Sequence, residues 1–340
     1  MKEELRNQIT LCSYVLTVFV IWLHAGEPLI SSIPGQIAVP GFFILSGFLL
    51  FYHSPEAGEG WLKEKLKRRV RTLLIPYLSW NLIYFLIYLL FGKTSWRELP
   101  AAVLHYSCNP VFWYLYQLIL IMLVSPLLYS VLKRRITAVI WLVLIFLAAA
   151  FYPVLAGAVP VELINGDALF YFSLGGTVSL HIYKGETAEK TIPGENGTED
   201  TAPAGPLFSS RPVYGLAVFS AGLLVSAMLG QVLPPALINL SVLGVRTAGA
   251  FALWFLLRLL PEIPVKPWMR ITFFIYAVHY MVIRAVWAAE TAAGLNGYAA
   301  ANIVTYLLMP AVCTAAARVL YLAMKKTVPG LLSVLTGGRG

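Results

Sequence analysis

Charged residues are scarce in this chain. Asp, Glu, Lys and Arg make up 12% of its 340 residues, apolar residues make up 59%, and the mean hydropathy is +0.75. Ordinary soluble domains carry about a quarter charged residues, so this balance excludes that class. The composition predicts an integral membrane protein, and we expect it in the cell (plasma or inner) membrane.

Cysteine is also rare. The three cysteines, Cys12, Cys108 and Cys313, lie far apart and share no zinc or redox spacing, so we interpret them as small apolar side chains. HExxH, paired His/Cys spacings and GxSxG are absent from the sequence. No metal site and no bound cofactor are therefore expected. An internal repeat is absent too, which gives no support to an inverted-repeat transporter.

Long apolar runs are what the chain has instead. About 20 apolar residues are needed to cross a bilayer, and helices satisfy their own backbone groups there. The predicted fold class is an all-α polytopic membrane protein, a single domain over residues 1–340 with about ten transmembrane helices in one bundle. The predicted spans are Ile9–Ile30, Gln36–His53, Leu73–Phe91, Val111–Leu132, Thr137–Leu155, Asp167–Tyr183, Val213–Val232, Ala236–Leu260, Ile271–Ala289 and Tyr298–Met324.

Lysine and arginine are distributed unevenly between the two sides of these spans. With the N-terminus in the cytoplasm, all 25 fall on the inner side except Lys93, Arg97, Arg246 and Arg284. The positive-inside rule therefore predicts cytoplasmic N- and C-termini. We interpret the net charge of +9 as a topology signal and expect no nucleic-acid partner. Residues 184–211, rich in Gly, Pro, Thr, Ala and Glu, are predicted to form a flexible cytoplasmic linker.

The first apolar run ends in a histidine, His24. Ionisable residues inside a bilayer are rare and mark functional sites, although His24 could instead lie at the membrane surface. Glu27 follows three residues later, a helical spacing from which it would orient or charge-balance His24 if the helix extends that far. Gly26 and Pro28 favour a helix that ends before Glu27.

Two further ionisable residues lie inside predicted spans. His279 follows Tyr276 by three residues on one helix face, either in a functional site or as a structural histidine bonded to a neighbouring helix. Arg246 lies deep in its span, where an arginine costs about 3 kcal/mol, so it must face a partner or a water-filled cavity. It would stabilise an oxyanion, contact a donor phosphate, or pair with Asp167 or Glu162.

Two segments point to close packing and to anion binding. Pro40, Gly41, Ser46 and Gly47 interrupt the second run, which predicts a bent, closely packed helix with Ser46 as a candidate binding residue. The basic run Lys63–Arg71 is either a collar touching anionic lipid headgroups, at about 1 kcal/mol per charge, or a set of phosphate contacts. The candidate phosphate ligands are Arg68, Arg69 and Arg71.

Four motifs in order resemble the acyltransferase 3 family of ten-span membrane acyltransferases with a cytoplasmic N-terminus. They extend over about residues 8–325. The motifs are the second-run segment Val39–Leu50, the basic run ending in Ile75-Pro76-Tyr77, Phe112-Trp113-Tyr114-Leu115 leading to Ser125-Pro126-Leu127, and Thr272–His279.

The resemblance implies transfer of an acyl group, usually acetyl from acetyl-CoA, to a hydroxyl of a cell-surface glycan or lipid-linked sugar. It makes acyl-CoA a co-substrate, and the expected partners are this acceptor and membrane lipids. His24 matches the family's central catalytic histidine, and a near-neutral imidazole suits a general base. The resemblance also favours roles for His279, Tyr276 and Trp113 in the site.

One position departs from the family pattern. The family usually has Arg or Lys eleven residues before the histidine, where this chain has Ser13, and Arg6 is the nearest upstream base. This departure leaves open a catalytically impaired family member. A competing class is a transporter or flippase for lipid-linked sugars that uses the same spans and Arg246 without any chemistry.

Overall fold

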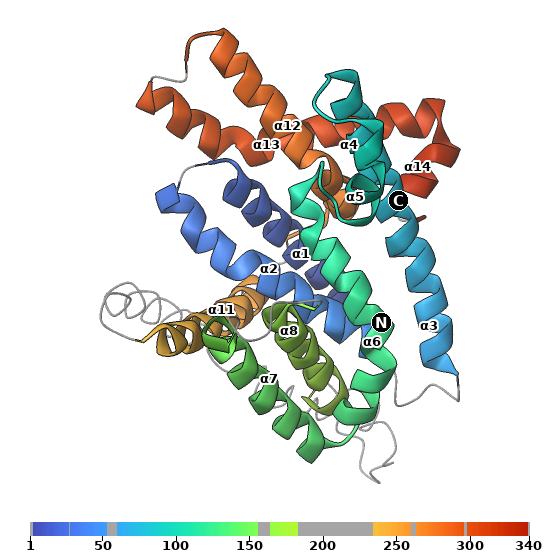
Figure 1. The fold of residues 1–340 in the computed structure, drawn as a ribbon, viewed down its shortest axis with the longest axis vertical. Helices are drawn as coiled ribbons and strands as arrows, with labels where there is room; N and C mark the ends of the chain where they lie inside the picture. Colours follow the sequence, from blue (N-terminus) through green and yellow to red (C-terminus); the bar gives the residue numbers. More distant parts are fainter. Residues whose placement is uncertain are drawn as a thin grey trace, which may run out of the picture. The chain divides into compact units, whose positions relative to one another are not determined.

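Helices make up every regular element in the described part of the chain. The computed structural model describes residues 3–26, 28–52, 60–155, 164–182, 234–259, 263–295 and 298–338 (Figure 1). These residues form two compact units. Unit 1 contains Met1–Val39, Leu62–Leu123 and Ile263–Gly340, and unit 2 contains Pro40–Trp61 and Val124–Glu262.

Unit 1 is organised around the N-terminal helix. Its elements are α1 (Glu3–His24), the start of α2 (Pro28–Phe51), most of α3 (Trp61–Arg69), a π-helical turn (Val70–Leu74), α4 (Ile75–Leu90), α5 (Leu99–Leu104), the start of α6 (Trp113–Leu132), α12 (Thr272–Ala292), α13 (Ala299–Thr327) and α14 (Pro329–Thr336). A 3₁₀ turn, Pro267–Ile271, leads into α12.

Helix α1 packs parallel to α12 and antiparallel to α13. Tyr14 meets Trp268 edge-on at 4.9 Å between ring centroids, and further along α1 the His24 ring lies beside that of His279. Against α13 the order is reversed, because the Tyr14 and Thr314 hydroxyls lie 3.3 Å apart while Trp22 Nε1 donates to the Tyr306 carbonyl at 3.2 Å. These contacts fix the rotation of α1.

The segment after α4 folds back along that helix. Trp96 packs edge-on against Phe85, and α5 then returns toward the start of α4. There the Tyr77 hydroxyl donates to the Leu104 carbonyl at 2.8 Å. This bond and the contact between Trp96 and Phe85 hold the segment against α4, although most of its residues are exposed. Sequence patterning predicted only a loop here, since α5 is short.

Unit 2 contains the rest of α2 and α6, together with α7 (Arg135–Leu155), α8 (Gly166–Thr177), a π-helical turn (Val178–Ile182) and α11 (Pro235–Leu259). Helices α2 and α8 touch backbone to backbone. A Cβ on Gly47 would lie 2.0 Å from the Phe172 carbonyl oxygen, and one on Gly175 would lie 1.9 Å from that of Ile44. The close packing predicted around Gly47 is therefore confirmed.

Six described helical stretches are long and apolar enough to cross a membrane: Glu3–His24, Trp61–Leu90, Pro110–Leu132, Leu237–Leu257, Pro267–Ala292 and Ala299–Thr327. Two shorter apolar helices, Gly35–Phe51 and Arg135–Phe151, match the second and fifth predicted spans, and α8 matches the sixth. The predicted span Val213–Val232 and the predicted linker at 184–211 lie outside the described residues.

Two predicted helix boundaries were wrong. Helix α1 stops at His24 rather than Ile30, because Gly26 adopts φ +98°, a left-handed conformation that ends helices. The third helical stretch begins at Trp61 rather than Leu73, since Lys, Arg and Glu are good helix formers outside an apolar run.

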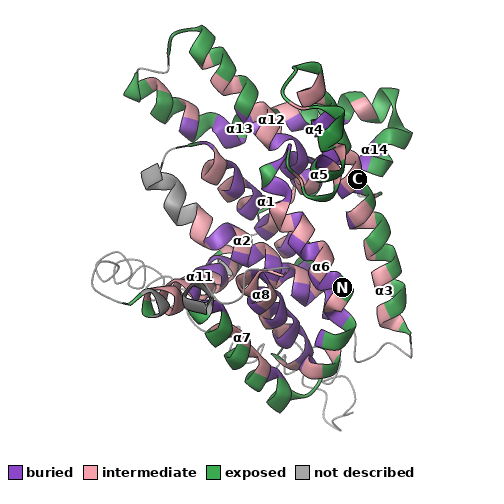
Figure 2. Cartoon of the chain, viewed as in Figure 1, coloured by how far each residue is buried: buried purple, intermediate pink, exposed green. Residues whose placement is uncertain are grey.

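Exposed apolar side chains cover α7 and α13 (Figure 2). Ile140 and Leu144 on α7, and Val304 and Leu308 on α13, are each more than half exposed. A soluble protein rarely presents such continuous apolar surface, whereas lipid-facing helices require it. The surface thus agrees with a membrane protein.

Candidate active site

His24 is the last residue of α1, and the turn that follows holds it in place. Gly26 has a positive φ and lies against the Trp287 indole of α12, where an added Cβ would come within 3.1 Å of the ring. Both the conformation and the space therefore favour glycine. The turn leaves the His24 side chain half-buried beside α12 rather than carried outward on a longer helix.

The His24 ring faces two side chains of α12. Its centroid lies 5.6 Å from that of His279, at an interplanar angle of 40°, and 6.5 Å from that of Tyr280. These separations are within the range of direct ring contacts. His279 is fully buried and lies well inside α12, so His24 is next to the interior of unit 1.

The hydrogen bonding of His279 assigns its tautomer. Its Nδ1 lies 2.5 Å from the Tyr276 carbonyl oxygen, and because a carbonyl only accepts, Nδ1 carries the proton. Nε2 of the neutral ring is then an acceptor. This buried atom has no hydrogen-bond partner among the described residues. Leaving such an acceptor unsatisfied costs about 1–3 kcal/mol, so a neighbouring donor is expected at Nε2.

Tyr276 holds the start of α12 against the start of α6. Its hydroxyl donates to the Val111 carbonyl at 2.6 Å, and its ring stacks on Phe112 at 5.6 Å with an interplanar angle of 8°. Trp113 follows as the first residue of α6. These contacts fix the turn of α12 whose carbonyl binds His279. In this structure Tyr276 therefore supports the histidine.

Of the three predicted phosphate-binding arginines, Arg69 connects to this cluster. It is half-buried at the end of α3 and lies within electrostatic range of Tyr114. Tyr114 meets the Tyr276 ring edge-on at 6.1 Å. Arg68 and Arg71 are exposed.

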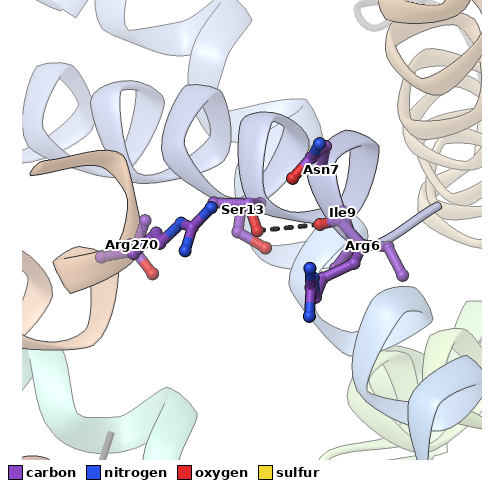
Figure 3. A pocket seen from close by; sticks show the side chains of 7 residues that line it. Arg6, Asn7, Ile9, Ser13 and Arg270 are labelled. Carbon is purple, nitrogen blue, oxygen red and sulfur yellow. Dashed lines mark hydrogen bonds between the residues drawn. The ribbon is translucent and has the colours of Figure 1, made fainter. Parts of the chain in front are cut away.

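A separate pocket lies against the N-terminal half of α1 (Figure 3). Its volume is about 280 Å³, and it is lined by Arg6, Asn7, Ile9, Thr10, Ser13, Arg270 and Thr272. Arg270 extends from the turn before α12 toward Ser13 (Figure 3). The position where the family usually has a basic residue thus faces an arginine from another helix.

Ser46 and Arg246 belong to unit 2. Arg246 Nη1 donates to Asp167 Oδ2 at 3.1 Å, with both side chains about one-third exposed. One of the alternatives predicted for Arg246, pairing with Asp167, is therefore present. Ser46 lies half-buried on the part of α2 that carries Gly47.

The sequence predicted one helical contact that does not apply in the structure and gave no indication of another contact that is present. The i,i+3 helical relationship between His24 and Glu27 does not apply because α1 has already ended, and Glu27 lies outside the described residues. The contact of Arg270 with the Ser13 pocket was missed, since Arg270 entered the prediction only as a cytoplasmic charge. Its position immediately before a span that carries a histidine was the available signal.

Comparison with known protein families identifies the family of the chain. The profile of the acyltransferase 3 family, described as an acyltransferase domain, matches residues 8–322. The chain belongs to the acyltransferase 3 family. It is therefore a multi-pass membrane acyltransferase.

A curated relative covers most of the chain. The succinoglycan biosynthesis protein ExoH of Rhizobium meliloti (strain 1021) is 25% identical over 326 residues, which cover 89% of this chain and 80% of the relative. No solved structure matches the chain.

Proposed function

We propose that this acyltransferase moves an acyl group, acetyl in the simplest case, from acyl-CoA to a hydroxyl of a cell-surface glycan or lipid-linked sugar. His24 is its general base. The observation that carries the proposal is the pairing of His24 with a buried histidine whose Nε2 has no partner in the described part of the chain. The name of the relative, a succinoglycan biosynthesis protein, supports a polysaccharide acceptor.

The chemistry is an exchange of one ester for another. His24 removes the proton of the acceptor hydroxyl as its oxygen attacks the thioester carbonyl carbon. The tetrahedral intermediate then expels the thiolate, which takes the proton back from the His24 imidazolium. The products are the acylated acceptor and the free thiol, so atoms and charge balance without a metal or a redox partner.

His279 has a positioning role in this scheme. With its own proton fixed on Nδ1 by the Tyr276 carbonyl, its Nε2, which no described residue engages in this structure, is the acceptor that an N–H of the neighbouring His24 ring reaches during catalysis. The other His24 nitrogen is then left unprotonated, as a base must be. The role is that of the third group in a nucleophile–base–orienter arrangement, carried here by an uncharged ring.

We further propose the ten-span topology, with both termini cytoplasmic and a single domain joined by a linker at 184–211. The relative directions of the helices support it. Contacts of Trp80 with Phe274 and of Tyr84 with Ala277 make α4 parallel to α12, as α1 is, whereas α13 is antiparallel to α1. Odd-numbered spans must share one direction and even-numbered spans the other.

Purified protein in nanodiscs tests the proposal with radiolabelled acetyl-CoA and a lipid-linked or polymeric glycan extract. Label is expected in the glycan, in an ester that mild alkali releases. A protein that only transports the lipid-linked sugar would leave the glycan unlabelled, and that result would refute the proposed acyl transfer.

A further inference from the structure

The pocket against α1 combines two positive charges with neutral polar groups. Arg6 and Arg270 reach it from two elements, and Asn7, Thr10 and Ser13 add polar atoms from α1. Among the described residues that line it, none is acidic. A concave site with two guanidinium groups and no carboxylate suits an anion, and arginine pairs best with phosphate or carboxylate oxygens.

The two arginines differ in how far they are neutralised. Arg6 lies 3.5 Å from Glu3 in an exposed pair, which contributes little because solvent screens it. Arg270 forms no ion pair with any described residue, and its side chain extends toward Ser13 (Figure 3). Arg270 therefore supplies the uncompensated charge of the pocket.

The pocket lies at a defined distance from the proposed base. Ser13 and His24 are on the same helix, eleven residues apart, which at about 1.5 Å per residue is about 16 Å. Because α12 runs parallel to α1, Arg270 and His279 are separated in the same direction, by nine residues or about 14 Å. A donor that fills both sites needs phosphate at one end and its reactive carbonyl at the other end of a long arm.

We propose that this pocket is the phosphate subsite for the acyl donor, with Arg270 as its principal ligand and Arg6 as the second. The inference rests on the proposed function and deepens it. A thioester on a phosphopantetheine arm has the required chemistry, whereas a small acyl phosphate is too short to occupy both ends. Arg270 provides, from the turn that leads into α12, the positive charge that α1 lacks at Ser13.

Equilibrium binding of free coenzyme A to the detergent-purified full chain tests this without turnover. All variants are made in a His24→Ala background, so that the measurement does not depend on catalysis. Arg270→Ala is expected to weaken binding about ten-fold or more, and Arg6→Ala by less, because one charge-assisted phosphate contact has that effect. Arg318→Ala, which removes an exposed arginine of α13 outside the pocket, is the matched control and keeps full affinity.

A charge relocation separates loss of the site from loss of the fold. Ser13→Arg added to Arg270→Ala restores the charge to the same pocket from α1, and recovery of coenzyme A affinity supports the proposal. Unchanged affinity in a monodisperse Arg270→Ala protein would overturn it. The assignment would also be overturned if Arg270→Ala lost co-purifying anionic phospholipid, measured by native mass spectrometry, while coenzyme A bound as before.

The same measurements distinguish this inference from the proposed function. If coenzyme A binding depends on Arg270 but the His24→Ala protein still transfers acetyl groups, the phosphate subsite is supported and the role of His24 as general base is refuted. If His24→Ala is inactive but no pocket variant changes coenzyme A binding, the role of His24 as general base is supported and the phosphate subsite is refuted.

Discussion

The His24 ring at the end of α1 lies 5.6 Å from the ring of His279, centroid to centroid. One ring is half-buried. The other is fully buried, with a fixed tautomer and an acceptor nitrogen that no described residue engages. If the neutral His24 ring donates its one N–H to Nε2 of His279, the other His24 nitrogen carries no proton and can act as a base. The proposed proton transfer depends on this pair.

The role of His279 can be tested by replacing each of its nitrogens separately. His279→Asn retains a donor near the position of Nδ1 and removes the acceptor, whereas His279→Gln places an amide oxygen near Nε2. We expect His279→Asn to lower kcat about 10- to 100-fold with little change in the donor KM, since misplacing a catalytic group has effects of that size. His279→Gln should recover part of the loss.

Steady-state kinetics in nanodiscs, with thermal stability measured in parallel, would check this prediction. Equal losses in the two variants, or losses that follow the stability of each protein, would mean that His279 acts only as part of the packed core.

The contact between α2 and α8 predicts a strong stability effect in unit 2. Gly47→Ala or Gly175→Ala places a methyl group about 2 Å from a backbone carbonyl oxygen, and a helix backbone cannot yield as a flexible side chain can. Each variant should be destabilised by about 1–3 kcal/mol or more and show a lower melting temperature in detergent.

Gly244→Ala is the matched control, because Gly244 is in α11 and a methyl group added there would meet no described atom within 4 Å. Removing this helical glycine should leave the melting temperature unchanged or raise it. The free energy of unfolding would then increase by up to about 1 kcal/mol. A similar decrease for all three variants would refute the close approach of α2 and α8.

The Arg246–Asp167 ion pair gives a test of what Arg246 does. Removing one partner, as Arg246→Gln or Asp167→Asn, should destabilise the protein because the remaining charge loses its opposite charge in a partly buried position. If the pair is purely structural, the double variant Arg246→Gln/Asp167→Asn should recover stability and transfer activity together. Recovery of stability without activity would instead indicate that Arg246 contacts a substrate.

The apolar runs predicted most of the described helices because lipid imposes length and composition on every span. Helix ends were predicted less well. The predicted first span continued to Ile30, whereas the left-handed conformation of Gly26 ends the helix at His24. Likewise, nothing in the hydropathy distinguishes α5, which folds back along α4, from an ordinary loop.

The site was predictable where a residue is unusual for its surroundings. His24 and His279 were both selected because a titratable ring is rare in an apolar run, but their contact was not predictable, since about 250 residues separate them in the chain. Arg270 was missed for the opposite reason. A basic residue at the end of a span is ordinary, and only the parallel packing of α12 on α1 brings it to the pocket beside Ser13.

Loss of the His24 imidazole is the most direct test of the central claim. His24→Ala and the exposed-histidine control His105→Asn would be compared for transfer of labelled acetyl from acetyl-CoA to glycan, at matched expression and melting temperature. We expect His24→Ala to lose at least about 100-fold in rate and His105→Asn to retain full activity, because general-base catalysis contributes at least that much. Acetyl transfer at an undiminished rate by a folded His24→Ala protein would contradict the account.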